Sequence, residues 1–124
     1  MRKICFVTGT RAEYGLLSRL MKLVKEDKDL RLQVIATNMH LMPEYGETYK
    51  EIEKDGFTID KKVYMHKPSD DAHGIISSMA EEMQGMNDAL SELKPDILVL
   101  LGDRYDILVA AQVALIHRIP IAHI

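Results

Sequence analysis

The sequence predicts an α/β protein with a doubly wound parallel sheet of the Rossmann-like kind. Short apolar segments alternate along the chain with longer amphipathic ones, as expected for strands joined by helical crossovers. The segment Ile97–Leu101 is apolar at every position, which is typical of a parallel strand covered on both faces. Because no internal repeat, low-complexity tract or linker interrupts the alternation, residues 1–124 are expected to form one folding unit.

Five strands and four helices are expected. The strands are predicted at Lys3–Thr8, Leu30–Thr37, Phe57–Met65, Ile97–Leu101 and Ile121–Ile124. The helices are predicted at Ala12–Lys25, Glu44–Lys54, Ile75–Leu93 and Asp106–His117, with loops at Asn38–Pro43 and Lys67–Asp71. Helical spacing predicts a first apolar stripe of Leu16, Leu17, Leu20, Leu23 and Val24, and another of Ile76, Met79, Met83, Met86, Leu90 and Leu93. The last helix is apolar on most faces, which predicts that it is packed inside the protein.

Composition narrows the class of protein. The 124 residues are 47% hydrophobic, and a chain of this size can bury roughly two thirds of its unfolded surface. The net charge of -3, with acids and bases interspersed, leaves no basic patch for nucleic acid. No apolar run approaches the ~20 residues of a membrane-spanning helix, and the N-terminus enters a strand pattern instead of a secretory signal. We therefore expect a cytoplasmic protein without nucleic-acid or membrane partners, in which the lone Cys5 forms no internal disulfide.

The first polar segment at a strand end is Thr8 to Gly15, where a strand turns into a helix. Gly9 permits close approach of backbone to a ligand, and the start of the following helix offers unpaired N–H groups to an anion. Arg11 adds a planar, permanently charged donor suited to phosphate. The segment lacks the glycine patterns of dinucleotide sites and of P-loops, and a purely structural turn is the alternative.

A second polar segment, Gly102-Asp103-Arg104, follows the strand Ile97–Leu101. In open parallel sheets ligands bind beyond the carboxyl ends of the strands, so a carboxylate and an arginine at this position suit proton transfer and anion binding. The structural alternative is that Asp103 caps the next helix while Arg104 pairs with Asp106.

The histidines do not suggest a metal site. His40, His66, His73, His117 and His123 lack the spacing of metal ligands, and no cofactor is expected. His40 and His123 lie near predicted strand ends, where a role in the site is open. The other three are expected on the surface or in loops.

Several motifs in order give the chain a specific resemblance. The segments Gly9–Leu17, Leu101–Asp106 and Ile119–Ile124, with Asn38–Leu41 and Tyr45–Tyr49 between them, resemble the hydrolysing UDP-N-acetylglucosamine 2-epimerases of sialic acid and related nonulosonic acid biosynthesis. The resemblance spans the whole chain. It implies that residues 1–124 are an incomplete N-terminal Rossmann-like domain of a two-domain GT-B fold. The chain also ends within a predicted strand, and we expect it to be the front portion of a longer protein.

The resemblance implies a reaction as well. Such enzymes eliminate UDP from UDP-N-acetylglucosamine and add water to the resulting glucal, which yields N-acetylmannosamine. Asp103 and His123 would then be catalytic, and substrate would be bound by Arg11, Glu13, Tyr14, Gly15, His40 and Arg104. Some relatives carry Ser in place of Gly15. The family pattern continues with a His-Gly-Gly-Glu segment and a second domain, so we expect the 124 residues alone to be inactive and the full-length protein to be a homo-oligomer.

Two alternatives differ in class from this interpretation. A phosphoacceptor receiver module has similar length and alternation, but it requires clustered acids after the first strand, where this chain has Thr8-Gly9-Thr10. A non-hydrolysing epimerase or a glycosyltransferase shares the GT-B fold. The Arg-Ala-Glu-Tyr and Gly-Asp-Arg-Tyr segments favour the hydrolysing branch. The sequence leaves the sugar open, since related enzymes act on a 2,4-diacetamido substrate.

Overall fold

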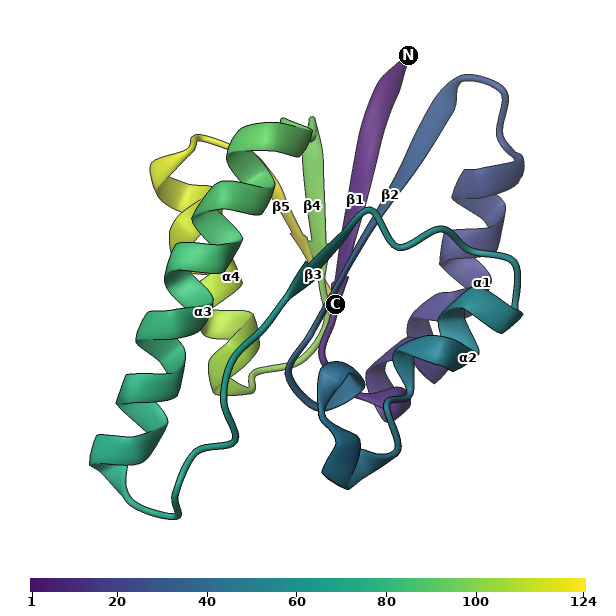
Figure 1. Cartoon of the computed structure of the whole chain (residues 1–124). Coiled ribbons are helices and arrows are strands. Elements are labelled where there is room, and N and C mark those ends of the chain that lie inside the picture. Colours follow the sequence, from purple (N-terminus) through teal and green to yellow (C-terminus); the bar gives the residue numbers. More distant parts are fainter.

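A five-stranded parallel sheet lies at the centre of the protein, with helices on both faces (Figure 1). The computed structural model describes all 124 residues. The strands are β1 (Arg2–Thr8), β2 (Leu30–Thr37), β3 (Lys61–Val63), β4 (Ile97–Leu100) and β5 (Ile121–His123). The helices are α1 (Arg11–Glu26), α2 (Tyr49–Lys54), α3 (Ala72–Leu93) and α4 (Tyr105–Ile116), with 3-10 turns η1 (Asn38–Leu41) and η2 (Pro43–Tyr45).

The strand order is β3-β2-β1-β4-β5, and every neighbouring pair is parallel. From β1 the chain adds β2 and then β3 on one side. It then crosses to the other side of β1, where it adds β4 and β5. The order therefore reverses between β1 and β4, and the loops that follow these two strands face each other at the carboxyl edge of the sheet. The predicted doubly wound, Rossmann-like fold is confirmed.

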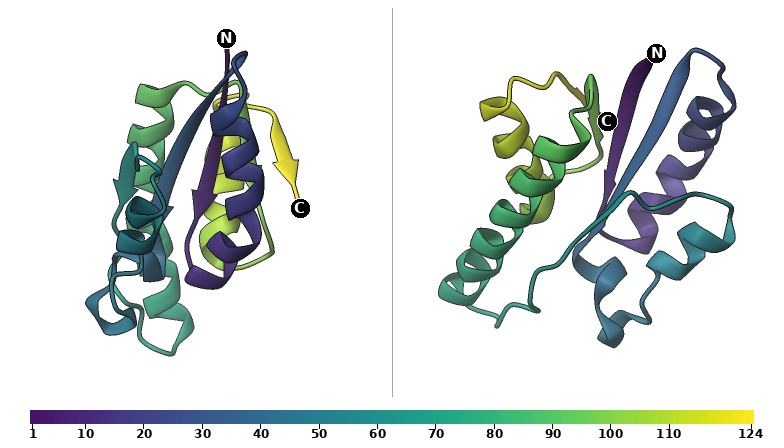
Figure 2. Two further views of the ribbon diagram at one scale, coloured as in Figure 1. Left: turned by 90° about the vertical axis from the view of Figure 1, so that its right-hand side faces the viewer. Right: turned by 45° about the horizontal axis from the view of Figure 1, so that its top comes forward.

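Each face of the sheet has its own apolar core. On one side Phe6, Val34 and Val99 pack with Leu17 and Met21 of α1. On the other side, strand residues such as Val7, Ile35 and Leu98 pack with α3 and α4. Figure 2 shows the two helix layers separated by the sheet. Burial on both faces explains why the strand sequences are apolar at consecutive positions.

Three segments differ from their predicted structure. The strand expected at Phe57–Met65 forms only at Lys61–Val63, because Phe57 turns into the core beneath α1 before the chain reaches the sheet edge. The expected loop Asn38–Pro43 contains 3-10 turns. The helix expected from Glu44 begins only at Tyr49, since Gly46 ends η2 in a left-handed conformation with φ +82°.

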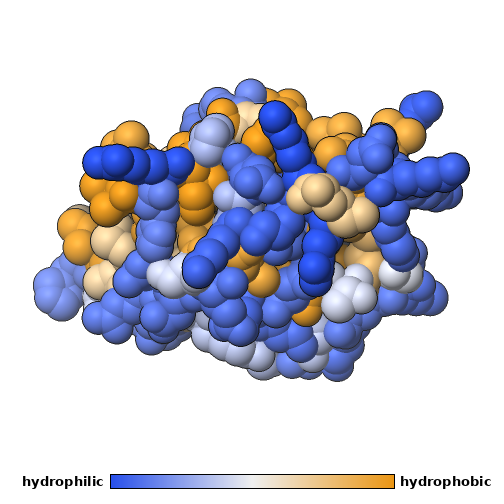
Figure 3. Space-filling model, turned by 90° about the horizontal axis from the view of Figure 1, so that it is seen from above, coloured by the Kyte–Doolittle hydropathy of each residue, from blue (hydrophilic) through white to orange (hydrophobic).

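The predicted apolar faces of the helices are partly wrong. Leu16 is 72% exposed and Leu23 is 61% exposed, whereas Tyr14, Leu17 and Met21 are buried. In α3 and α4, Ile76, Met83, Leu108, Leu115 and Ile116 are exposed. Each helix lies on one sheet face only, so its outer side is uncovered even where it is apolar. Figure 3 shows apolar residues on the left, the side on which Figure 1 draws α3 and α4, and others along the upper margin.

None of the helices combines the length and the apolar character needed to cross a membrane.

The adjacent residues Leu16 and Leu17 of α1 provide a test of which side of that helix is buried. We expect Leu17→Ala to lower the free energy of unfolding by about 2–5 kcal/mol, because Leu17 is 1% exposed and its removal leaves a cavity. Leu16→Ala is the matched control and should change stability by less than about 0.5 kcal/mol. Urea denaturation followed by circular dichroism measures both. Equal losses in the two variants would contradict the observed orientation of α1.

Candidate functional site

The turn after β1 is held by a reciprocal cap at the start of α1. Thr10 is the N-cap residue, and its Oγ1 accepts a hydrogen bond from the Glu13 N–H at 3.2 Å. Glu13 is buried, and its Oε1 accepts from the Gly9 N–H at 2.9 Å. The Thr-x-x-Glu spacing is thus a variant of the capping box. Glu13 occupies the Gly9 N–H, so that group does not face a ligand.

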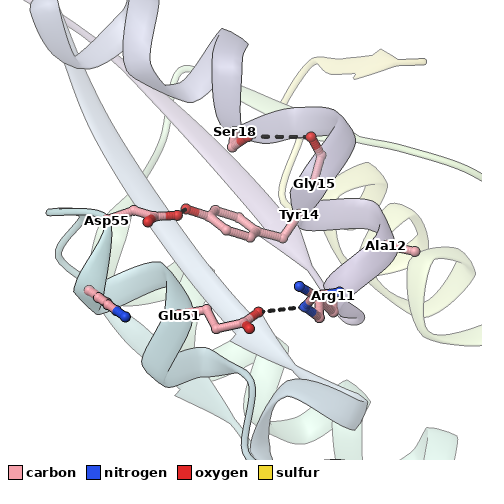
Figure 4. A pocket seen from close by; sticks show the side chains of 8 residues that line it. Arg11, Ala12, Tyr14, Gly15, Ser18, Glu51 and Asp55 are labelled. Atoms are coloured by element: carbon pink, nitrogen blue, oxygen red, sulfur yellow. Dashed lines mark hydrogen bonds and ion pairs between the residues drawn. The ribbon is translucent and has the colours of Figure 1, made fainter.

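Arg11 lies beside an open cavity of about 540 Å³ formed by the first turns of α1 and by α2 (Figure 4). Its side chain is 72% exposed, and its Nε donates to Glu51 Oε2 at 2.8 Å. Gly15 faces the same cavity, and a Cβ built there would meet no atom within 4 Å. An arginine bound only at Nε keeps its terminal nitrogens free for an anion.

Tyr14 supports the wall of that cavity. Its ring is buried against Phe57 and His40 in edge-to-face contacts, and its hydroxyl donates to Asp55 Oδ2 at 2.5 Å. Burial, followed by the hydrogen bond and the charge of Asp55, raises the pKa of the phenol. Tyr14 is therefore a neutral donor that ties α1 to the end of α2.

His40 is fully buried beneath the β1 turn. Its Nε2 lies 2.9 Å from Thr8 Oγ1, and its Nδ1 lies 2.9 Å from Thr48 Oγ1. Burial lowers the pKa of the imidazole to about 4. A neutral histidine with both ring nitrogens paired joins β1, η1 and the segment before α2. Contact of His40 with substrate, as the resemblance implies, stays a prediction.

The loop after β4 presents the second group of residues. Gly102 takes a left-handed conformation with φ +86°, which favours glycine. Asp103 is exposed at the carboxyl edge of the sheet, and it does not cap α4, so the capping interpretation was wrong. His123, in β5, lies with Nε2 2.6 Å from the Gly102 carbonyl oxygen, to which it donates. Asp103 and His123 therefore lie on the same surface, at the carboxyl edge of the sheet where the loop after β4 meets β5.

Asp106 joins the two loops. It is fully buried in the first turn of α4, and Arg104 Nε lies 3.6 Å from its Oδ1. A Cβ built on Gly9 would lie 2.1 Å from Asp106 Oδ2 and 3.4 Å from the Asn38 Cβ. The absence of a side chain at Gly9 therefore allows the β1 turn to pack on Asp106. The pairing of Arg104 with Asp106, one half of the structural alternative, is found.

Two buried glutamates share this region. Burial raises the pKa of Glu82 to about 9, and the charge of Asp106 adds to the effect. The pKa of Glu13 is also raised, chiefly by burial. Neither carboxyl oxygen of Glu82 or of Asp106 has a hydrogen-bond partner. Glu82 is therefore protonated and uncharged at neutral pH. Fewer negative charges surround Arg104 than the number of nearby carboxyl groups.

Sequence patterns gave weak signals for these supporting residues. Glu82 lies three residues after Met79 and four before Met86, so helical spacing puts it on an apolar face where a carboxyl is unusual. Asn38 belongs to the Asn38–Leu41 segment of the resemblance but was not predicted as a site residue; it is buried with φ +53°, and its Nδ2 has no partner. Nowhere do three His, Cys, Asp or Glu side chains group in the arrangement of a metal site.

Residues 22–124 match the sequence model of the family described as UDP-N-acetylglucosamine 2-epimerase. The chain belongs to this family. A GDP/UDP-N,N'-diacetylbacillosamine 2-epimerase (hydrolyzing) of Campylobacter jejuni is 49% identical over 99% of this chain, which covers 32% of the relative. A UDP-N,N'-diacetylbacillosamine 2-epimerase (hydrolyzing) of Legionella pneumophila is 39% identical over the whole chain and 33% of the relative. The receiver alternative is therefore excluded.

Solved structures of the family share the fold. The UDP-GlcNAc 2-epimerase from Neisseria meningitidis bound to UDP-GlcNAc superposes with a TM-score of 0.81 at 21% identity, covering 98% of this chain and 32% of that one. The S. aureus MnaA–UDP structure gives a TM-score of 0.84 at 18% identity, with 100% and 31% covered. The chain spans about a third of the length of the curated relatives it matches.

Alanine substitutions at Gly9 and at Gly15 are predicted to change the stability of the fold in opposite directions. We expect Gly9→Ala to destabilise the fold by about 1–3 kcal/mol, because the added methyl overlaps a buried carboxylate. Gly15→Ala adds a methyl to an open helical position and should stabilise by about 0.5–1 kcal/mol. Thermal and urea denaturation measure both variants. A neutral Gly9→Ala would show that the turn does not rest on Asp106.

The raised pKa of Glu82 predicts that the stability of the fold depends on pH. Its pKa is raised from 4.5 to about 9 in the folded state, so its contribution is fully present below pH 4.5 and is lost as the pH rises toward 9. Between pH 6.5 and 8.5, Glu82→Gln should gain stability over the wild type by up to about 1.4 kcal/mol per pH unit. The opposite effect of neutral His40 is present in both proteins, so it cancels from the difference between Glu82→Gln and the wild type.

Urea denaturation at several pH values measures this difference. Glu53→Gln, on the exposed surface of α2, is the control and should follow the wild type. A constant difference between Glu82→Gln and the wild type across the window would mean that Glu82 is ionised in the fold.

Proposed function

We propose that this chain is the incomplete N-terminal domain of a two-domain GT-B enzyme, a hydrolysing UDP-N-acetylglucosamine 2-epimerase acting on a UDP-linked N-acetylamino sugar. The observation that carries the proposal is the meeting of two loops at the point of strand-order reversal, through Gly9 and Asp106. This is where open parallel sheets bind ligands. The hydrolysing relatives named above support the type of reaction.

The proposed reaction has two steps. A base removes the proton at C2 of the sugar while the C1–O bond to UDP breaks, which leaves a 2-acetamidoglucal and UDP. Water then adds across the double bond, with OH at C1 and H at C2, and gives the free 2-epimeric sugar. The first step needs a base and stabilisation of the charge that develops on the departing diphosphate.

The residues of this chain suit parts of those tasks. Arg11 and Arg104 are partly exposed cations at the two loops, and we assign them to the diphosphate. Asp103 is exposed at the carboxyl edge and is assigned to proton transfer. His123 lies beside the same loop and is assigned to the reacting end of the sugar. Asp106 orients Arg104 from below without facing solvent.

Glu13, Tyr14, Gly15 and His40 divide into two groups under this proposal. Gly15 faces the Arg11 cavity and leaves room for substrate there. Glu13, Tyr14 and His40 are buried, so we assign them to holding the two loops in place. They would act on the substrate only through the residues that they position. The enzyme would need no metal or organic cofactor. We further propose a cytoplasmic homo-oligomer in a pathway to sialic or a related nonulosonic acid.

Substitution of Arg104 tests the proposal in the complete gene product. We expect Arg104→Ala to lower kcat/KM for UDP release from UDP-N-acetylglucosamine or its diacetamido analogue by about 10²–10³, as for loss of one charge-stabilising donor. Arg19→Ala, on the exposed side of α1, is the control and should retain activity. Chromatography of products measures UDP and the free sugar.

The products also separate the alternatives. Free N-acetylmannosamine, or its diacetamido counterpart, agrees with the hydrolysing reaction. UDP-N-acetylmannosamine would assign the chain to a non-hydrolysing epimerase, and transfer of the sugar to an acceptor would assign it to a glycosyltransferase. The 124 residues alone should give no product.

A further inference from the structure

The open cavity beside Arg11 lies between the facing sides of two helices, α1 and α2 (Figure 4). On α1, Arg11 and Tyr14 are three residues apart and therefore share a side of the helix. On α2, Glu51 and the following cap residue Asp55 are four residues apart and share a side in the same way. Arg11 pairs with Glu51 and Tyr14 pairs with Asp55, so two polar contacts join the helices across the cavity.

The backbone that carries Glu51 is fixed by tertiary contacts. Helix α2 has six residues, and its N-cap residue Thr48 makes no side-chain cap hydrogen bond. A helix this short is not stable in water by itself. In the fold, Ile52 is fully buried in the core, and Asp55 accepts from the Tyr14 hydroxyl directly after the helix. Glu51 directly precedes Ile52, so its backbone is held in place relative to α1.

The pair of Arg11 and Glu51 uses only one edge of the guanidinium group. Arg11 Nε donates to Glu51 Oε2 at 2.8 Å, whereas the whole group carries five N–H donors in a planar fork. The two terminal nitrogens form a separate edge, which can bind two oxygens of a phosphate group at once. Glu51 at Nε and a phosphate at the terminal nitrogens can therefore bind Arg11 together, without one replacing the other.

The exposure of this pair indicates that it contributes more to orientation than to stability. The side chains of Arg11 and Glu51 are 72% and 45% exposed, and ion pairs this exposed add little to the free energy of unfolding. An exposed arginine without a partner samples several rotamers, and a ligand that binds it must overcome the entropy lost on ordering. Pairing with Glu51 orders Arg11 before the ligand arrives, which removes part of that entropy loss.

We propose that Glu51 is a positioning residue for Arg11: it holds the guanidinium group at Nε so that the two terminal nitrogens meet the diphosphate of the UDP-sugar. Glu51 acts through Arg11 and touches no part of the substrate. The proposal rests on the proposed function, because it takes the diphosphate as the ligand of Arg11. A Glu51 carboxylate that competed with the diphosphate for Arg11 would have the opposite effect on binding, so the two roles are separable by experiment.

Substitutions of Glu51 in the complete gene product test this role. Isothermal titration calorimetry measures the Kd of UDP, and chromatography of products measures KM and kcat with UDP-N-acetylglucosamine and its diacetamido analogue. We expect Glu51→Ala to raise both Kd and KM about fivefold, because Arg11 must then be ordered on binding. Glu51→Gln should stay within about twofold of the wild type, since its amide oxygen still accepts from Nε. Glu53→Ala, an exposed residue of the same helix, is the matched control and should leave both values unchanged.

A double-mutant cycle shows whether Glu51 acts through Arg11. In an Arg11→Ala background, Glu51→Ala should change the Kd of UDP by less than about twofold, because the residue that it positions is gone. A purely structural role of Glu51 would instead lower the thermal stability and weaken UDP binding equally in both backgrounds.

The outcomes separate the two levels of proposal. If the wild type releases UDP from neither substrate, the proposed function fails, whatever the Kd values are. If it releases UDP but Glu51→Ala binds UDP as tightly as the wild type or more tightly, or if the loss persists without Arg11, the function stands and the positioning role is overturned. Alanine is the strongest helix former, so α2 should form in Glu51→Ala. Glu51→Met, which keeps the side-chain length without a carboxylate, repeats the test if the alanine variant does not fold.

Discussion

The packing of Gly9 against Asp106 is the contact on which the rest of this structure depends. It joins the turn after β1 to the first turn of α4, which come from opposite sides of the strand-order reversal. A side chain at position 9 would occupy the position of a carboxylate oxygen. The short distance between the two loops, and therefore the shape of the proposed site, follows from the absence of one Cβ.

The buried charges around this contact explain how an anion site can be built next to carboxyl groups. Glu13 is used internally, since it accepts the Gly9 N–H. Burial keeps Glu82 protonated at neutral pH, and Arg104 lies beside Asp106. Arg11 and Arg104 stay accessible at the surface. The carboxyl groups beneath them are protonated, paired with an arginine or bonded to a backbone N–H.

The site has a buried support and an exposed rim. Tyr14 and His40 link the β1 turn to α2 and to the segment before it through hydrogen bonds and aromatic contacts. Arg11, Asp103 and His123 lie at the surface above that support. This arrangement fits a site whose reactive groups meet a ligand from one side, while the residues that position them are held by packing.

The sequence by itself determined the fold class, the order of the elements and the two polar loops, because apolar period and strand-end position are local properties. It also determined the family, through short motifs in a fixed order. The tertiary structure alone decided which residues of those motifs face outward: Glu13 and His40 turned out buried, and Leu16 exposed. It also revealed Asn38 and Glu82 beside the loops, since residues far apart in the chain become neighbours only when the sheet brings β1, β2 and β4 together and helices pack upon it. Burial of a carboxyl or an amide depends on those distant partners, and no local pattern contains that information.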